Sequence, residues 1–353
     1  MNDLAKEQKQ ASPEGSAILR ADMKSGEIHN FYIFHGEEAY LRTYYLEQLR
    51  SRLLEGPAEA FNFHRFDAKS FSAEAFQDAV DALPVMAERT MIQIDDLDLS
   101  SLDESTRELM TEILLDLPDY VCICMVYDIV EFKLDKRQKK FADAVQKAAK
   151  ELNFPKQTQA SLTDWCLRHF KSAGKRITND LCAYLIFQTG GTMTALKPEI
   201  DKIAAFAVGE EITRQDVDAV VIPVLDAQVF QITDELASRN FAKALARLQT
   251  IFQMQEKPIP VLAAIASNLR RLLAAKTLSE NGKGSDELMK LCGMGDYPAR
   301  KTMSNARNFT MQWCRKAVLL CAETDYKLKT SYDDSERLVE LMILQLAEEA
   351  KNA

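Results

Sequence analysis

Residues 31–41 read FYIFHGEEAYL: four apolar residues, a histidine, a glycine and the start of an amphipathic segment. The apolar run is typical of a short buried strand, and the residues after Gly36 have helical spacing. A phosphate-binding loop has this same frame, but it ends in Gly-Lys-Ser/Thr. Here no such ending follows, and Glu37 and Glu38 would place two carboxylates where an anion would bind. Such contacts cost on the order of several kcal/mol, so we expect the strand, turn and helix without a working phosphate site.

The next 120 residues continue this alternation of strands and helices. Further strands are expected where apolar or alternating runs occur, at residues 61–68, 90–95 and 120–127. Helices are expected between them, at residues 37–56, 70–84, 100–118 and 134–150. Strands that alternate with crossover helices indicate a mostly parallel sheet covered on both faces.

After this region the strand patterns end and helical patterns fill the chain. We expect four segments: a polar N-terminal leader (1–30), an α/β domain (31–158), a domain of three short helices (159–222) and a larger all-helical domain (223–353). The predicted fold class is therefore α/β plus all-α. A length of 353 residues with 47% apolar content is sufficient for two or three packed cores.

The charge is distributed unevenly along the chain. The net charge is −9, but residues 257–330 carry 13 Lys or Arg and 6 Asp or Glu, a local balance of +7. A segment this basic is suited to contact nucleic acid. Solvated helix faces are an equally good explanation, and charge alone does not separate the two.

The seven cysteines are an odd number and none forms a CxxC pair, which favours reduced thiols in the cytoplasm. The first residues lack the apolar core of a signal peptide, and no uncharged apolar run reaches the roughly 18 residues of a membrane span. We therefore expect a soluble cytoplasmic protein without a membrane partner.

Motifs for catalysis are not visible. The four histidines are far apart in sequence, and neither HExxH nor GxSxG occurs. Asp95 and Asp96, at the end of an expected strand, resemble a Mg²⁺-binding acid pair, but without a lysine partner they read as a turn or a relic. No catalytic residue, metal site or cofactor is expected.

Two features remain as binding candidates. In DALPVMAERT, Pro84 ends a helix and leaves Leu83, Val85 and Met86 on a connecting turn, where apolar side chains are exposed unless they fold back onto the core. The second candidate is the basic helical region, whose cations are interleaved with tyrosines that can stack on unpaired bases. Packing between helices of an oligomer is the alternative for that region.

The order of elements resembles the delta subunit of the bacterial DNA polymerase III clamp loader, from about residue 30 to the C-terminus. The resemblance depends on several short strings in this order: YIFHGEEAYL, LPVMAERTMI, LDKRQKKF, LKPEIDKIAAFA, IPVLAAIASNLRRLLAAKTL, YPARKTMSNARNF and DYKLKTSY. It implies an AAA+-like domain without a working nucleotide site, a three-helix lid and a helical collar that joins a five-subunit ring.

The resemblance also implies a function. Members of this family insert an apolar turn into the sliding clamp (the beta subunit) and hold its ring open for loading onto primed DNA, while neighbouring motor subunits bind and hydrolyse ATP. By position the anchor is Leu83, Val85 and Met86, where Val-Met replaces the commoner Leu-Phe.

The partners implied are the clamp, the motor subunits, a delta-prime-like subunit and primed DNA, all within a DNA-directed DNA polymerase holoenzyme, a nucleotidyltransferase complex. Arg300, Lys301 and Tyr332 are the expected DNA contacts. Two other functions stay open: an AAA+ ATPase with an atypical phosphate loop, and a non-enzymatic helical adaptor.

Overall fold

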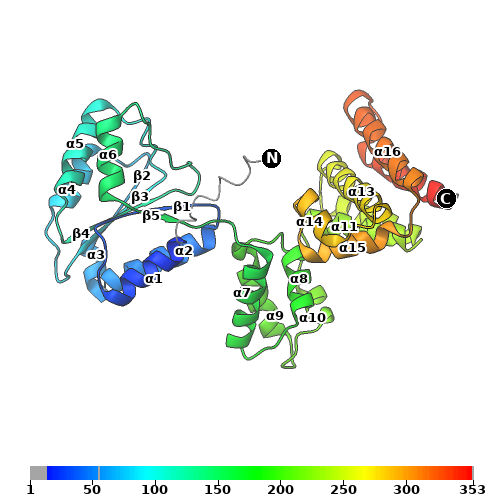
Figure 1. Cartoon of the computed structure of the whole chain (residues 1–353), viewed down its shortest axis with the longest axis horizontal. Helices are drawn as coiled ribbons and strands as arrows, with labels where there is room; N and C mark the ends of the chain where they lie inside the picture. Colours follow the sequence, from blue (N-terminus) through cyan, green and yellow to red (C-terminus); the bar gives the residue numbers. More distant parts are fainter. Residues whose placement is uncertain (1–13, 55, 352–353) are drawn as a thin grey trace. The chain divides into compact units, whose positions relative to one another are not determined.

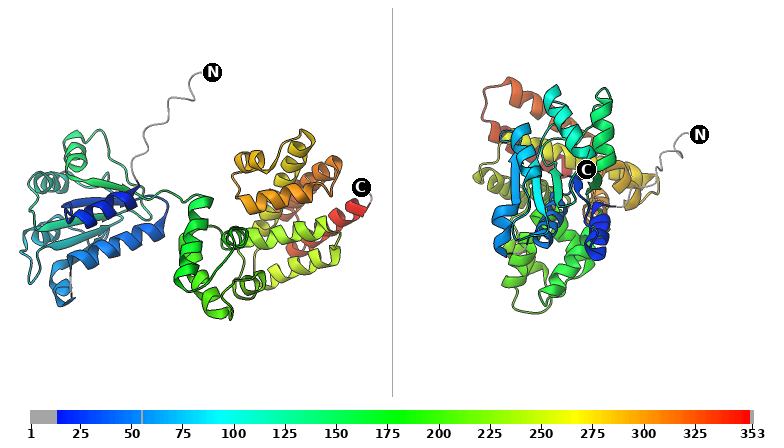
Figure 2. Two further views of the ribbon diagram at one scale, coloured as in Figure 1. Left: turned by 60° about the horizontal axis from the view of Figure 1, so that its bottom comes forward. Right: turned by 90° about the vertical axis from the view of Figure 1, so that its left-hand side faces the viewer.

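The computed structural model describes residues 14–54 and 56–351, and the chain divides into two compact units, Met1–Gln157 and Thr158–Ala353 (Figures 1 and 2). The border between them falls next to the end of the expected α/β domain at residue 158, whereas the further division at residues 222 and 223 stays a prediction.

The first unit is built on a five-stranded sheet in which every strand pairing is parallel. The strand order is β2-β3-β4-β1-β5. The strands are β1 (Phe31–His35), β2 (Phe63–Asp67), β3 (Thr90–Asp95), β4 (Val121–Val126) and β5 (Lys150–Asn153). The three central strands are buried along almost their whole length, as expected for a parallel sheet covered by helices.

Helices cover both faces of this sheet (Figure 1). On one face lie α4 (Ala73–Asp81), α5 (Glu104–Leu115) and α6 (Lys139–Ala148), which pack on alternate strand residues such as Phe31 and Ile33. On the other face lie α1 (Gly15–Ser25) and α2 (Ala39–Leu53), which pack on Tyr32 and Phe34. A short 3-10 turn, η1 (Gly56–Ala58), and α3 (Glu59–Asn62) connect α2 to β2.

The expectation of a polar leader over residues 1–30 was wrong for its described part. Residues 15–25 form α1, whose Leu19 is fully buried. The Asp22 carboxylate accepts a hydrogen bond from the Tyr32 hydroxyl (2.8 Å) and pairs with the Lys150 ammonium (2.7 Å). The helix is attached partly through polar contacts, which a hydropathy pattern does not reveal. Residues 1–13 lie outside the described residues.

Strand β5 was also missed by the sequence analysis. It is an edge strand in which only Leu152 is buried, so its sequence KELN has no apolar run. Its first residue, Lys150, falls within the helix expected over residues 134–150. The backbone nevertheless pairs with β1 from Tyr32 to His35, and β5 completes the sheet beside the Gly36 turn.

The second unit is all-helical. Its first part has four helices where three were expected: α7 (Gln159–Ser172), α8 (Asn179–Gln188), α9 (Met193–Phe206) and α10 (Arg214–Val220). Its second part has α11 (Leu225–Ala237), α12 (Phe241–Gln253), α13 (Pro258–Glu280), α14 (Ser285–Cys292), α15 (Asp296–Ala306), α16 (Met311–Thr330) and α17 (Ser335–Lys351). These seven helices enclose one apolar core.

Two further observations concern membrane-spanning helices and cysteines. In residues 14–54 and 56–351, no helix is long and apolar enough to cross a bilayer. All seven cysteines are free thiols and six are buried. Cys122 and Cys124 pack in the sheet core.

Candidate functional site

The connection from α4 to β3, residues 82–89, exposes the apolar residues expected to bind a partner. Helix α4 ends where the Ala82 N–H donates to the Asp78 carbonyl (3.0 Å) and Ala82 turns to an extended conformation (φ −66°, ψ 119°). Pro84 prevents the helix from continuing, since it lacks an N–H and disfavours a helical residue before it. Leu83, Val85 and Met86 are 73%, 47% and 88% exposed, so these side chains project into solvent and do not fold back onto the core.

Hydrogen bonds to other segments fix this turn at Val85 and at its far end. The Asn62 carboxamide accepts a hydrogen bond from the Val85 N–H (2.7 Å) and donates one to the Val85 carbonyl (2.7 Å). At the far end of the turn, the Arg89 guanidinium donates to the Ile28 carbonyl (3.0 Å) and to the Asn30 side chain (3.1 Å). Sequence analysis missed Asn62 because no local pattern marks a contact 23 positions along the chain.

Other exposed apolar residues lie at the same edge of the sheet. The described part of the first unit exposes seven large apolar side chains, those of Tyr44, Phe61, Leu83, Val85, Met86, Leu115 and Ile129. Five of them precede β2, β3 or β4, and the amino ends of neighbouring parallel strands meet at one edge. Ile129 follows β4 and so lies at the opposite edge. An apolar surface concentrated in this way is typical of a protein-binding site.

The Gly36 turn is closed by protein groups where a phosphate loop would bind its anion. A side chain at Gly36 (φ 116°) would place its Cβ 2.3 Å from the Phe154 carbonyl oxygen. That same oxygen accepts a hydrogen bond from the Glu38 N–H (3.0 Å). The buried Arg42 guanidinium donates to the Gly36 carbonyl and pairs with the Asp128 carboxylate.

The side chain of Glu38 is also buried, at the start of α2. A carboxylate at that helix end is stabilised by the helix dipole. An anionic ligand at the same helix end would meet this buried carboxylate as a like charge.

Asp96 organises a loop, which agrees with the turn interpretation of the acid pair. One carboxylate oxygen accepts hydrogen bonds from three consecutive N–H groups, those of residues 128–130, at 2.8–3.0 Å. Partial burial opposes ionisation, but these donors outweigh it and hold the pKa of Asp96 below its ordinary value. Asp95 is engaged by the Arg65 guanidinium (2.7 Å) and the Gln93 amide (2.7 Å). No cluster suited to a metal ion occurs among the described residues.

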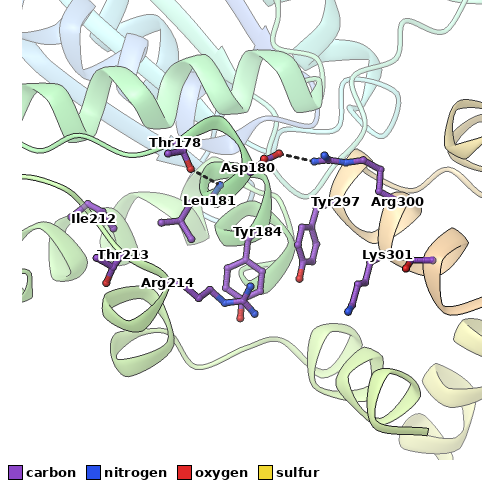
Figure 3. A pocket seen from close by; sticks show the side chains of 11 residues that line it. Thr178, Asp180, Leu181, Tyr184, Ile212, Thr213, Arg214, Tyr297, Arg300 and Lys301 are labelled. Carbon is purple, nitrogen blue, oxygen red and sulfur yellow. Dashed lines mark hydrogen bonds and ion pairs between the residues drawn. The ribbon is translucent and has the colours of Figure 1, made fainter. Parts of the chain in front are cut away.

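In the second unit, Arg300 and Lys301 line a pocket of about 570 Å³ between α8, α10 and α15 (Figure 3). The Arg300 guanidinium pairs with Asp180 (2.8 Å) and Asp296 (2.7 Å). The Lys301 ammonium lies 3.6 Å from the Asp234 carboxylate. Both cations are therefore compensated within the chain, which lowers the charge that they offer to a phosphate.

The third expected DNA contact lies elsewhere. Tyr332 is fully exposed on the loop between α16 and α17, and it is not among the residues that line the pocket. Tyr326, near the end of α16, is also largely exposed. The structure thus places Arg300 and Lys301 together on α15 and Tyr332 on a separate loop, where a free aromatic ring is available for stacking.

Comparison with known proteins agrees with this architecture. A family model of the DNA polymerase III delta subunit matches residues 32–154, and a family model of the C-terminal domain of that subunit matches residues 226–346. The DNA polymerase III subunit delta of Bacillus subtilis is 25% identical over 331 residues, which cover 92% of this chain and 94% of that protein. A probable DNA polymerase III subunit delta of Aquifex aeolicus is 23% identical, with 87% and 88% covered.

Among solved structures, the Bacillus subtilis DNA clamp loader delta protein aligns with a TM-score of 0.56 and 23% identity. The alignment covers 94% of this chain and 99% of that one, and it supports the fold.

The five-stranded parallel sheet of the first unit and the helices of the second define a protein of the α/β plus all-α class. The matches to both halves of the chain make the assignment more specific: the chain belongs to the DNA polymerase III delta-subunit family. It is thus a subunit of a replicative DNA polymerase complex.

Proposed function

We propose that this chain binds the sliding clamp through Leu83, Val85 and Met86 and holds the clamp ring open for loading onto primed DNA. The observation that carries the proposal is the exposure of these three apolar side chains on a turn whose backbone is fixed. Apolar anchors at the centre of an interface each contribute about 2 kcal/mol or more when they fill a pocket. A short turn is therefore sufficient to hold a partner.

Ring opening requires more than affinity. A turn that binds the open and the closed ring equally well leaves their ratio unchanged. We infer that the turn fits the clamp surface better when the neighbouring ring interface is open. The test is binding of the cognate clamp by variants in which all three anchors are replaced with alanine or serine, because binding as tight as that of the parent protein contradicts the site.

We also propose that this chain does not hydrolyse ATP by itself. The Glu38 N–H and the space beside Gly36 are both taken up by the Phe154 carbonyl, and the Glu38 carboxylate is buried at the start of α2. Equilibrium dialysis with labelled ATP tests this proposal. Saturable tight binding by the isolated chain would favour the ATPase alternative.

We further propose that the seven-helix part of the second unit associates with the ATP-binding motor subunits and a delta-prime-like subunit. Leu341 and Leu344 are about half exposed and lie three residues apart, on one face of α17. Pull-down of the motor subunits and the clamp from a lysate separates this function from that of an unrelated adaptor. Recovery of neither partner would refute it.

Contact with DNA is proposed for Tyr332, and for Arg300 and Lys301 within the assembled loader. Full exposure of Tyr332 supports base stacking, which typically contributes about 1–3 kcal/mol per base. Neutral variants are preferable for the cations, since charge reversal would place a carboxylate beside the acidic partners of Arg300. A shallower salt dependence of primed-template binding in Arg300→Gln and Lys301→Gln would support phosphate contact.

A further inference from the structure

We propose that Asn62 is the positioning residue of the clamp-binding turn. This inference rests on the proposed clamp-binding function, which it deepens. Asn62 is the last residue of α3 and only 1% exposed. Its side chain forms hydrogen bonds with Val85, the middle residue of the anchor, which lies 23 positions later in the sequence.

The carboxamide of Asn62 is fully engaged by backbone groups. Its Nδ2 donates to the Ala58 carbonyl (2.6 Å) and to the Val85 carbonyl (2.7 Å), while its Oδ1 accepts from the Val85 N–H (2.7 Å). Two carbonyls on one side and one N–H on the other fix the orientation of the amide, since only its nitrogen donates. The hydrogen bond to Ala58 holds the Asn62 side chain against its own segment, and the two hydrogen bonds to Val85 hold the turn against Asn62.

These hydrogen bonds order a turn whose exposed apolar side chains contribute little to its own stability. An exposed turn between a helix that ends at Asp81 and a strand that begins at Thr90 has few apolar contacts of its own to order it. Met86 also adopts a positive φ of 56°, an unfavourable conformation for a side chain with a Cβ. The two hydrogen bonds to Val85 hold the neighbouring backbone, so less conformational entropy is lost when the clamp binds.

Asn62→Ala removes all three hydrogen bonds without touching an anchor side chain. Freeing roughly one residue of backbone should weaken clamp binding about tenfold, measured by surface plasmon resonance with the cognate clamp. The matched control is Ile92→Val in β3, a buried residue of the sheet core, which lowers stability but leaves the turn intact and should bind as the parent does. Loss of binding in both variants would point to general destabilisation and overturn the proposal.

Hydrogen exchange supplies a readout that needs no clamp. In the parent protein, the Val85 amide should exchange more slowly than a freely exposed amide, because Asn62 accepts its hydrogen bond. It should become fast in Asn62→Ala and stay slow in Ile92→Val. A fast Val85 amide in the parent protein refutes the proposal even if the variant does not fold.

The two proposals fail in different ways. If variants of Leu83, Val85 and Met86 bind the clamp normally, the proposed function is wrong. If those variants lose binding while Asn62→Ala keeps parental affinity, the anchor stands and the role of Asn62 is refuted. If Asn62→Ala loses affinity while its Val85 amide stays protected, Asn62 acts by some other route and the inference is again refuted.

Discussion

Single alanine substitutions at the three anchor positions should weaken clamp binding in the order of their exposure. Full burial of a Leu, Met or Val side chain contributes about 2 kcal/mol, and only the exposed fraction is available to the partner. With exposures of 88%, 73% and 47%, Met86, Leu83 and Val85 offer about 1.8, 1.5 and 0.9 kcal/mol. Since 1.4 kcal/mol corresponds to a factor of ten, the expected losses are about 20-fold, tenfold and fivefold.

The assay is surface plasmon resonance with the immobilised cognate clamp at one fixed salt concentration. Ile129→Ala is the matched control: Ile129 is 89% exposed but follows β4, whereas the turn precedes β3. A six-residue strand spans roughly 20 Å, so Ile129 lies well away from the turn and its variant should bind normally. The reasoning is refuted if the Ile129 variant loses as much affinity as the Met86 variant, or if the triple anchor variant binds like the parent.

Three further predictions concern stability, measured by urea unfolding. Gly36→Ala should lower the free energy of unfolding by more than about 2 kcal/mol, because the added Cβ clashes with the Phe154 carbonyl oxygen. Gly26 also has a positive φ but open space around it, so Gly26→Ala should lower the free energy of unfolding by only about 1 kcal/mol. Equal losses in the two variants would contradict the clash. Asp96→Asn should cost about 1 kcal/mol at pH 7. The pKa of Asp96 is lowered in the folded state, so its contribution is present above the ordinary Asp pKa and should disappear as the pH falls through the lower folded value; a pH-independent difference would count against this. Arg300→Gln should cost less than about 1 kcal/mol, since its ion pairs are half exposed, and a larger loss would show that these pairs hold the helices together.

The sequence predicted the elements whose burial is continuous. The buried run of β4 follows directly from an apolar run, because a strand covered on both faces has little room for polar residues. In β3 the apolar residues Met91, Ile92 and Ile94 are enough to predict a strand, although Thr90 and Gln93 are buried with them. Strand β5 and helix α1 could not be predicted in this way. Only one residue of β5 is buried, and α1 is held partly by the Asp22 carboxylate, so neither has a clear apolar pattern.

In the candidate site, too, local sequence patterns predict some features, whereas contacts between distant segments are not predictable. The turn at Leu83, Val85 and Met86 was predictable, since Pro84 stops the helix, but the sequence left open whether these side chains fold back onto the core. The contact with Asn62 was not, because it depends on how α3 and the turn meet in the folded chain. Nor does the charge pattern reveal the ion pairs of Arg300 and Lys301, whose acidic partners include residues from distant helices.

The binding free energy of the three anchors limits how far the turn alone can shift the clamp ring between its closed and open geometries. The three anchors together offer about 4 kcal/mol, and this sum is the most by which they alone can favour one ring geometry over another. A ring that is open 1% of the time by itself needs a preference of about 5.5 kcal/mol to become 99% open. For such a ring, the remaining preference has to come from further contacts. The apolar edge of the sheet offers them, since Phe61 and Leu115 are exposed at the amino ends of the strands that flank β3. In the proposed complex with the clamp, the turn would be the centre of this broader apolar edge, and the hydrogen bonds to Val85 would hold the anchors in position beside it.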